Sequence, residues 1–234
     1  MTDRGDDATF DALRDLPAPP PPPLGAALEA ELDALEAVAT RRPLRDFARV
    51  ALLSLAYGAA FLFLLTLRRD LHGLPTWWLI AYGLAWFTGF TALCYLAIVP
   101  RPGAVVPRWR AVGIGAGIVA LGFVTAGLAM HPSASNSTIY GLARLHRGHA
   151  CLEIGLTTAI VPVILGALAL RGALPVGSRW TAAGLGAAGG SLGGLVLHLH
   201  CPIADGWHLG VVHGGVVVVA ALLAAALVPK LTDR

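Results

Sequence analysis

The stretch TAAGLGAAGGSLGGLVLHLHC, residues 181–201, decides the fold of this chain. It contains no Asp, Glu, Lys or Arg, and a helix of about 20 apolar residues crosses the roughly 30 Å hydrocarbon core of a bilayer. Gly186, Gly190 and Gly194 recur at a spacing of four, and small residues at this spacing let helix backbones approach closely. The stretch therefore predicts a transmembrane helix packed tightly against a neighbour, which we expect to be the helix at about 150–170.

The whole chain has the composition of a membrane protein. It is 56% hydrophobic and 13% charged, with a mean hydropathy of +0.69, values that are atypical of a soluble domain. The apolar segments are long and uninterrupted, whereas a β-barrel would show short segments of alternating hydrophobicity. The sequence predicts an all-α integral membrane protein whose six transmembrane helices lie at about 47–67, 77–99, 112–130, 150–170, 181–201 and 207–228.

The distribution of Lys and Arg predicts the orientation of these helices. With the N-terminus in the cytoplasm, the cytoplasmic segments from Arg41 onward, next to the helix ends, carry eleven Lys and Arg and the external loops carry four, as the positive-inside rule requires. Cys151 and Cys201 then face outward, and Cys94 lies toward the cytoplasmic side. The predicted parts are a cytoplasmic N-terminal segment at 1–46, the transmembrane domain at 47–228 and a short cytoplasmic tail at 229–234.

The N-terminal segment has the pattern of a partner-binding element. Two apolar stripes at helical spacing flank the polyproline spacer Pro17–Pro23, and a segment this short cannot bury a core of its own. Such a segment suits folding onto a partner, and the alternative is a disordered tail with weak helicity. The candidate partner-binding residues are Phe10, Leu13, Leu16, Leu28, Leu32 and Leu35.

Cysteines and histidines gather where three of the predicted helices meet one surface of the membrane. Cys151 begins the fourth helix and Cys201 ends the fifth, and the tight turn at 202–206 brings the sixth helix back beside Cys201. We therefore expect Cys151 and Cys201 to form one outward-facing sensing site. The candidate metal ligands are Cys151, Cys201, His149, His198, His200 and His208.

Three interpretations of this gathering stay open. Thiolate and imidazole ligands suit Zn²⁺ and copper, and thiolates alone suit softer heavy metals. Two thiols outside the cytoplasm could instead form a disulfide. Alternatively, the histidines are interfacial and the cysteines are small apolar helix residues. His213 lies one to two turns deeper along the sixth helix, where it and Glu153 need an explanation.

The topology and the two cysteines resemble the NrsF-type anti-sigma factors, six-helix inner-membrane proteins of bacteria. The resemblance covers the short N-terminal segment, the six helices and the minimal C-terminal tail. Its most specific parts are Cys151 at the start of the fourth helix and Cys201 in the run His200-Cys201-Pro202. It implies that an extracytoplasmic-function sigma factor is held by residues 1–46, and that the cysteines sense metal or oxidative stress.

The sequence thus predicts a membrane-bound negative regulator of transcription, which is not an enzyme and makes no direct contact with nucleic acid. The predicted trigger is a periplasmic metal or oxidant acting at Cys151 and Cys201. The competing hypothesis is a polytopic membrane thiol oxidoreductase, or a transporter that binds metal or haem at His198, His208 or His213. The sequence lacks the Cys-x-x-Cys pair that would favour an oxidoreductase. It also shows no broken helix or inverted repeat, which would favour a transporter.

Overall fold

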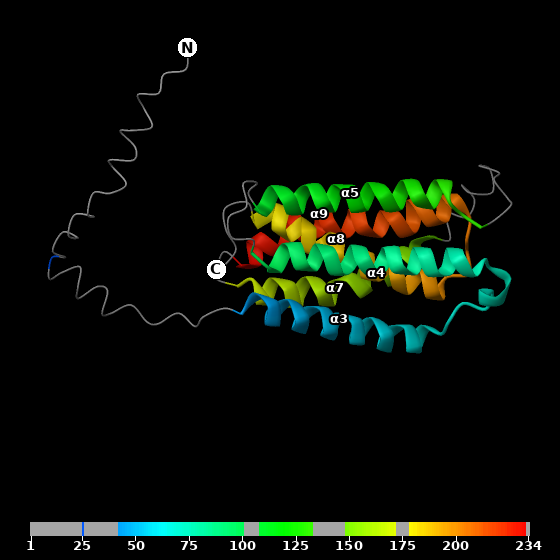
Figure 1. Cartoon of the computed structure of the whole chain (residues 1–234), viewed down its shortest axis with the longest axis horizontal. Helices are drawn as coiled ribbons and strands as arrows, with labels where there is room; N and C mark the ends of the chain where they lie inside the picture. Colours follow the sequence, from blue (N-terminus) through cyan, green and yellow to red (C-terminus); the bar gives the residue numbers. More distant parts are fainter. Residues whose placement is uncertain (1–24, 26–41, 101–107, 133–147, 172–177, 233–234) are drawn as a thin grey trace, which may run out of the picture. The chain divides into compact units, whose positions relative to one another are not determined.

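A computed structural model describes residues 25, 42–100, 108–132, 148–171 and 178–232 of the chain. Within these residues the secondary structure is helical, and six helices are long and apolar enough to cross a membrane (Figure 1). The six helices that the sequence predicts are confirmed, with ends that differ by a few residues. The helices are α3 (Pro43–Leu65), α4 (Thr76–Ile98), α5 (Arg108–Ala129), α7 (Gly148–Ala169), α8 (Ser178–His200) and α9 (Gly214–Thr232), with a 3₁₀ turn η1 (Leu71–Gly73) and a π-helical turn η2 (His208–His213) that leads directly into α9.

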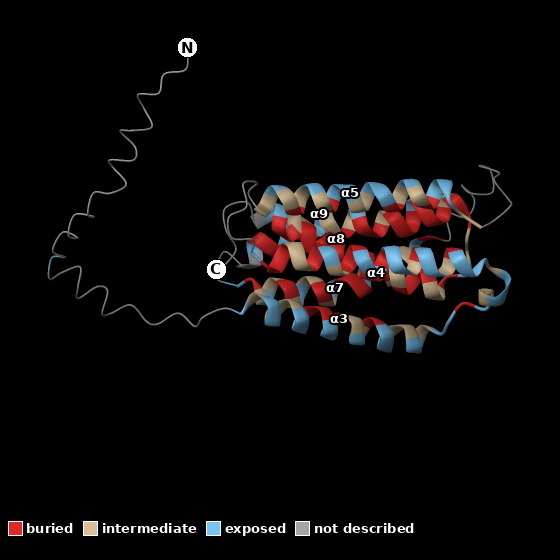
Figure 2. Cartoon of the chain, viewed as in Figure 1, coloured by how far each residue is buried: buried red, intermediate tan, exposed pale blue. Residues whose placement is uncertain are grey.

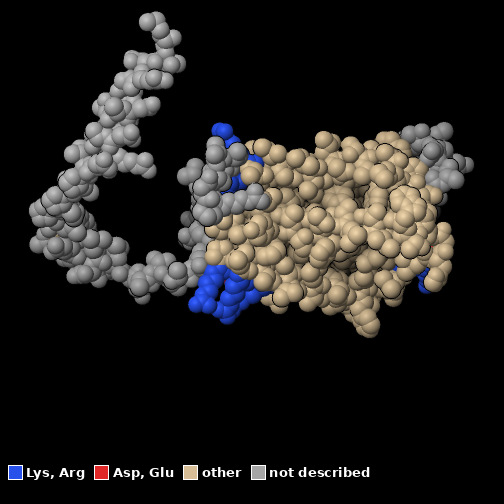
Figure 3. Space-filling view, in the orientation of Figure 1, with Lys and Arg blue, Asp and Glu red and all other residues tan. Residues whose placement is uncertain are grey.

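The helices alternate in direction, so their termini gather at two opposite ends. At one end the Trp78 indole N–H donates to the Met130 carbonyl at 2.8 Å, and Cys151 contacts Cys201. We call this the cysteine end. At the other end Arg108 at the start of α5 donates to the carbonyl of Leu96 on α4. Lys and Arg side chains are prominent around that second end, where α3 begins, and sparse along the helices (Figure 3).

Helix α8 is the centre of the bundle. It contacts α3, α4, α5, α7 and α9. In its most apolar segment 83% of the residues are buried, whereas in the corresponding segment of α3 only 22% are. Figure 2 shows the same contrast between the buried middle of the bundle and its exposed outer helices. Every other spanning helix is therefore in direct contact with α8.

Glycines make this central position of α8 sterically feasible. Gly189 and Gly193 face the backbone of α7, which is the neighbour that the sequence predicts. Gly186 and Gly190 of the predicted stripe face the backbone of α9 instead, and Gly194 faces an aromatic ring of α4. Because glycines lie on several faces of α8, one helix can pack closely against three neighbours at once.

The outward surface of the bundle is apolar. Large side chains on α3, α5 and α9 are more than half exposed, among them Phe63, Ile118 and Leu222. A soluble protein rarely exposes contiguous apolar surface of this extent, whereas lipid-facing helices require it. The burial pattern therefore agrees with the hydropathy in indicating a multi-pass membrane protein.

The predicted N-terminal parts lie outside the described residues. The two apolar stripes, with Phe10, Leu13, Leu16, Leu28, Leu32 and Leu35, belong to a separate unit that ends at Arg41. The polyproline spacer between them lies outside as well. Their role remains a prediction from the sequence.

Candidate functional site

Two thiols meet at the cysteine end of the bundle. Cys151 lies in the first turn of α7, and Cys201 follows the last residue of α8. Their Sγ atoms are 3.5 Å apart, and both cysteines are free. The Nε2 atom of His208 lies 3.3 Å from the sulfur of Cys201. The sequence argument from the short turn thus agrees with the position of His208 beside Cys201.

A fourth residue, His213, completes the group. The ligand atoms of Cys151, Cys201, His208 and His213 all lie within 4.8 Å of one another. We call these four residues the Cys/His cluster. Three of its members come from the candidate ligands of the predicted sensing site, whereas His213, one to two turns deeper along the predicted sixth helix, is a ligand only in the competing transporter hypothesis.

The π-helical turn η2 explains why His213 joins His208. In an α-helix, residues five apart point roughly 140° away from each other, because each residue turns the helix by about 100°. In a π-helix the hydrogen bond runs from residue i to residue i+5, which brings residues at that spacing onto one side. Accordingly, the rings of His208 and His213 are 5.0 Å apart and nearly perpendicular.

The turn is held in place by its first residues and by glycine. The Asp205 side chain accepts a hydrogen bond from the backbone N–H of His208 at 2.9 Å, which is the usual role of aspartate at a helix N-terminus. Gly210 lies against the backbone of α5 so closely that a Cβ would collide with it. The position of the two imidazoles therefore depends on a tight contact between η2 and α5.

The cluster is buried, and three of its four imidazole nitrogens lack hydrogen-bond partners among the described residues. His208 and His213 are each 1% exposed and Cys201 is 2% exposed. Among the described residues, the Nδ1 atom of His208 and both ring nitrogens of His213 have no hydrogen-bond partner. Burying a polar atom without a partner costs free energy, so this arrangement requires an explanation.

The surroundings of Cys201 favour the protonated form of its thiol. Its hydrogen bond with Cys151 and its burial raise its pKa, against the opposing influence of His208 and His213. A thiol becomes a metal ligand or a nucleophile only as the thiolate. Metal binding or oxidation at Cys201 therefore has to displace the thiol proton.

The loop between α3 and α4 closes the end of α8 next to the cluster. Buried Arg68 donates from its backbone N–H to the Leu199 carbonyl at 2.9 Å and from its guanidinium to the His198 carbonyl at 3.2 Å. The same guanidinium pairs with both carboxylate oxygens of Asp70 at 2.7 and 2.8 Å, and this pairing lowers the pKa of Asp70. In the sequence, Arg68 is one of the four Lys and Arg of the external loops, and nothing there indicates this capping role.

Three predicted ligands lie outside the cluster. The buried His198 imidazole is 3.0 Å from the Leu79 carbonyl of α4 and lies between aromatic side chains of that helix. His200 donates to the Thr66 carbonyl at 2.9 Å, and His149 is exposed in the first turn of α7. His198 and His200 therefore contact the neighbouring helix and the loop, and none of the three histidines belongs to the group around the two sulfurs.

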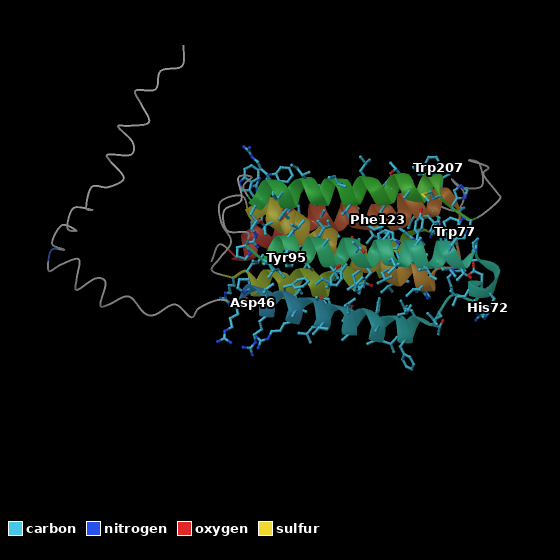
Figure 4. The ribbon with its side chains drawn as sticks, viewed as in Figure 1. Asp46, His72, Trp77, Tyr95, Phe123 and Trp207 are labelled. Atoms are coloured by element: carbon cyan, nitrogen blue, oxygen red, sulfur yellow. The ribbon has the colours of Figure 1, made fainter. Side chains whose placement is uncertain are left out.

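The remaining polar residues noted in the sequence lie apart from the cluster. Glu153 is exposed and lines an open groove of about 790 Å³ between α7 and α9. Cys94 is fully buried in α4, near the end marked by Tyr95 in Figure 4, whereas Trp77 and Trp207 mark the cysteine end. Cys94 is therefore a thiol in the same fold but at the opposite end from the cluster.

Comparison with known proteins gives one family. The chain matches the family model NrsF, negative regulator of sigma F, over residues 33–233. This range includes the whole described bundle and all four residues of the Cys/His cluster. Comparisons with curated proteins and with solved structures give no match.

Proposed function

The chain belongs to the NrsF family of negative regulators of sigma F, and from this we propose that it sequesters an extracytoplasmic-function sigma factor at the bacterial inner membrane. The sigma factor is held on the cytoplasmic side by residues 1–46. Both termini are cytoplasmic in this proposal, which the excess of Lys and Arg in the segments on that side supports. The regulator then controls transcription without contacting nucleic acid itself.

The proposed trigger is a periplasmic metal or oxidant that reacts with Cys151 and Cys201. The observation that carries this proposal is the 3.5 Å separation of two free thiols from residues 50 positions apart in the chain. At this separation one metal ion can reach both sulfurs. A small further approach would also allow an oxidant to join them in a disulfide, whose S–S bond is roughly 2 Å long.

The fold offers a route from this trigger to the sigma factor. Linking Cys151 to Cys201 constrains the start of α7 against the end of α8, and α8 contacts every other spanning helix. A signal can shift the protein from mostly bound to mostly free sigma factor only if it favours the releasing state by about 5 kcal/mol. Metal–thiolate binding supplies free energies of roughly 10 kcal/mol or more, and the equilibrium shifts by the part of this free energy that differs between the holding and the releasing state.

A sigma-dependent reporter, measured with and without cadmium or peroxide, tests the proposal. We expect Cys151→Ser and Cys201→Ser to repress normally and to lose induction, because serine keeps a similar volume but removes the soft ligand. The double variant should lose no more than either single variant. Cys94→Ser is the matched control and should be induced as the wild type is. Full induction in the double variant would show that the cysteines do not sense the signal.

A further inference from the structure

We propose that Cys151, Cys201, His208 and His213 form one four-coordinate site for a divalent d¹⁰ metal ion, Zn²⁺ or Cd²⁺. The role of this ion as the signal rests on the proposed function, whereas the site itself rests on geometry alone. In this proposal the species that acts directly at the cluster is a metal ion and not an oxidant. It also replaces three of the sequence candidates, His149, His198 and His200, by His213.

The distances within the cluster are close to those of a tetrahedral zinc site. With Zn–S bonds of about 2.3 Å and Zn–N bonds of about 2.0 Å, two sulfurs in a regular tetrahedron lie roughly 3.8 Å apart, and a sulfur and a nitrogen lie roughly 3.5 Å apart. The observed separations are 3.5 Å between the sulfurs and 3.3 Å between Cys201 Sγ and His208 Nε2. Both separations are within a few tenths of an ångström of the tetrahedral values, and the ligand atom of His213 lies within 4.8 Å of the other three.

The unpartnered imidazole of His213 is the independent evidence for a ligand. Its ring is 1% exposed, and neither nitrogen has a hydrogen-bond partner among the described residues. One of these nitrogens lies within 4.8 Å of both sulfurs and of a His208 nitrogen. A disulfide between Cys151 and Cys201 would leave His213 unsatisfied, whereas a metal ion bound by the sulfurs would accept its lone pair.

The π-helical turn gives the same indication. Such turns are uncommon and occur frequently at functional sites. Here the turn brings His208 and His213 to the same side of the helix, facing the thiols of α7 and α8. An uninterrupted α-helix would direct one imidazole away from them, so the irregular backbone serves the arrangement of the ligands.

Charge balance favours a divalent ion with two thiolates and two imidazoles. When the ion binds, each thiol forms a metal–sulfur bond and releases its proton to water, and each neutral imidazole donates a lone pair. Two thiolate charges then cancel the charge of the ion, so the complex is neutral. A neutral complex suits a cluster whose residues lie among apolar helices, where an uncompensated charge is costly. Hard cations such as Mg²⁺ prefer oxygen ligands, and none of the four ligands supplies oxygen.

Cobalt binding to the full-length reduced protein in detergent provides the test, because tetrahedral Co²⁺ with thiolate ligands has characteristic visible and charge-transfer bands. We expect one Co²⁺ per chain, with tetrahedral bands that Zn²⁺ and Cd²⁺ abolish by displacement. Losing a group that only orients a metal ligand weakens metal binding by about 10- to 100-fold, so losing a ligand itself, in His213→Ala or His208→Ala, should weaken it by at least about 100-fold. His200→Ala and His149→Ala are the matched controls and should leave the affinity unchanged.

A sulfur substitution keeps the test decisive if an alanine variant fails to fold. His213→Cys should bind Co²⁺ with a stronger thiolate charge-transfer band, because three sulfurs then contact the ion. The proposal is overturned if the wild type gives no tetrahedral cobalt spectrum, if His213→Ala binds as tightly as the wild type, or if His213→Cys has the wild-type spectrum. Cobalt binding needs no sigma factor, so an intact site in a chain that fails to regulate the reporter would refute only the proposed function.

Discussion

At the scale of single residues, the site depends on side chains that the sequence presents as ordinary surface charge. Arg68 and Arg69 are neighbours in one loop, but Arg68 is 3% exposed and caps the last carbonyls of α8, while Arg69 is exposed. The last carbonyls of a helix have no intrahelical partner, and a guanidinium with several donors can satisfy them. One arginine therefore fixes the end of α8 that leads to Cys201.

The first prediction concerns this cap. Arg68→Ala should lower the free energy of unfolding by about 1–3 kcal/mol, the usual range for buried hydrogen bonds to charged groups, whereas Arg69→Ala should change it by less than about 0.5 kcal/mol. Thermal or denaturant unfolding of the detergent-solubilised protein measures both. Equal stability of the two variants would contradict the capping role.

The same pair predicts a dependence on pH. The folded protein lowers the pKa of Asp70 from its ordinary value of 3.8 because Arg68 binds the ionised carboxylate. The pair therefore stabilises the folded state fully above that ordinary value, and this contribution is lost as the pH falls through the lower folded pKa. Unfolding followed between neutral pH and the acid range should show less acid destabilisation in Arg68→Ala than in the wild type. An identical acid profile would show that the pair is broken in solution.

At the scale of elements, the position of α8 at the centre depends on where its glycines lie. A Cβ on Gly193 would collide with the backbone of Gly155 on α7, which cannot move aside as a flexible side chain can. Gly122 lies inside α5 with nothing near its Cβ position. Both glycines lie inside apolar helices, and they differ in what a Cβ would meet.

This difference gives a matched pair of substitutions. Gly193→Ala should destabilise the protein by about 1–3 kcal/mol through overpacking, and it should separate Cys151 from Cys201 because Gly155 lies one turn from Cys151. Gly122→Ala should be neutral or stabilising by up to about 1 kcal/mol, since alanine favours the helix. Unfolding curves, together with the yield of disulfide formed by mild oxidation, report both effects. Unchanged stability and disulfide yield in Gly193→Ala would indicate that α7 and α8 are less closely packed.

The elements also show how far sequence reasoning reaches. The six spans follow from length and apolarity alone, and the approach of His208 to Cys201 follows from a short turn that leaves little freedom. The position of His213 beside the cysteines was not predictable in this way. An α-helical period directs His213 away from His208, whereas η2 is a π-helical turn that brings the two residues together. The direction of His198 toward α4 was also hidden, since a helical period gives the face of a residue but not which neighbour lies there.

At the scale of the whole molecule, the chain consists of a membrane bundle and a separate N-terminal unit that ends at Arg41. The bundle holds the Cys/His cluster, and the two apolar stripes of the sequence fall in the N-terminal unit. The family match begins at residue 33 and includes Leu35 but not the first stripe. In the proposed function the bundle receives the signal and the N-terminal unit binds the sigma factor.

The last prediction separates these two roles. Replacing Leu28 and Leu32 by Asp should abolish sigma-factor binding and give constitutive reporter activity, because two charges on the apolar stripe remove the surface that a partner would bury. The same variant should keep the stability of the membrane bundle and its cobalt spectrum, since the changed residues belong to the other unit. Replacing Glu29 and Glu31 by Gln is the matched control, because both residues lie between the two leucines in the sequence but off the apolar stripe. This control variant should preserve repression. Co-purification of the sigma factor with each variant, measured beside the reporter, decides the matter. If the sigma factor still co-purifies with the Leu28→Asp, Leu32→Asp variant and with a chain lacking residues 2–40, the contact lies in the loops at the arginine-rich end of the bundle. The apolar stripes would then have no part in holding it.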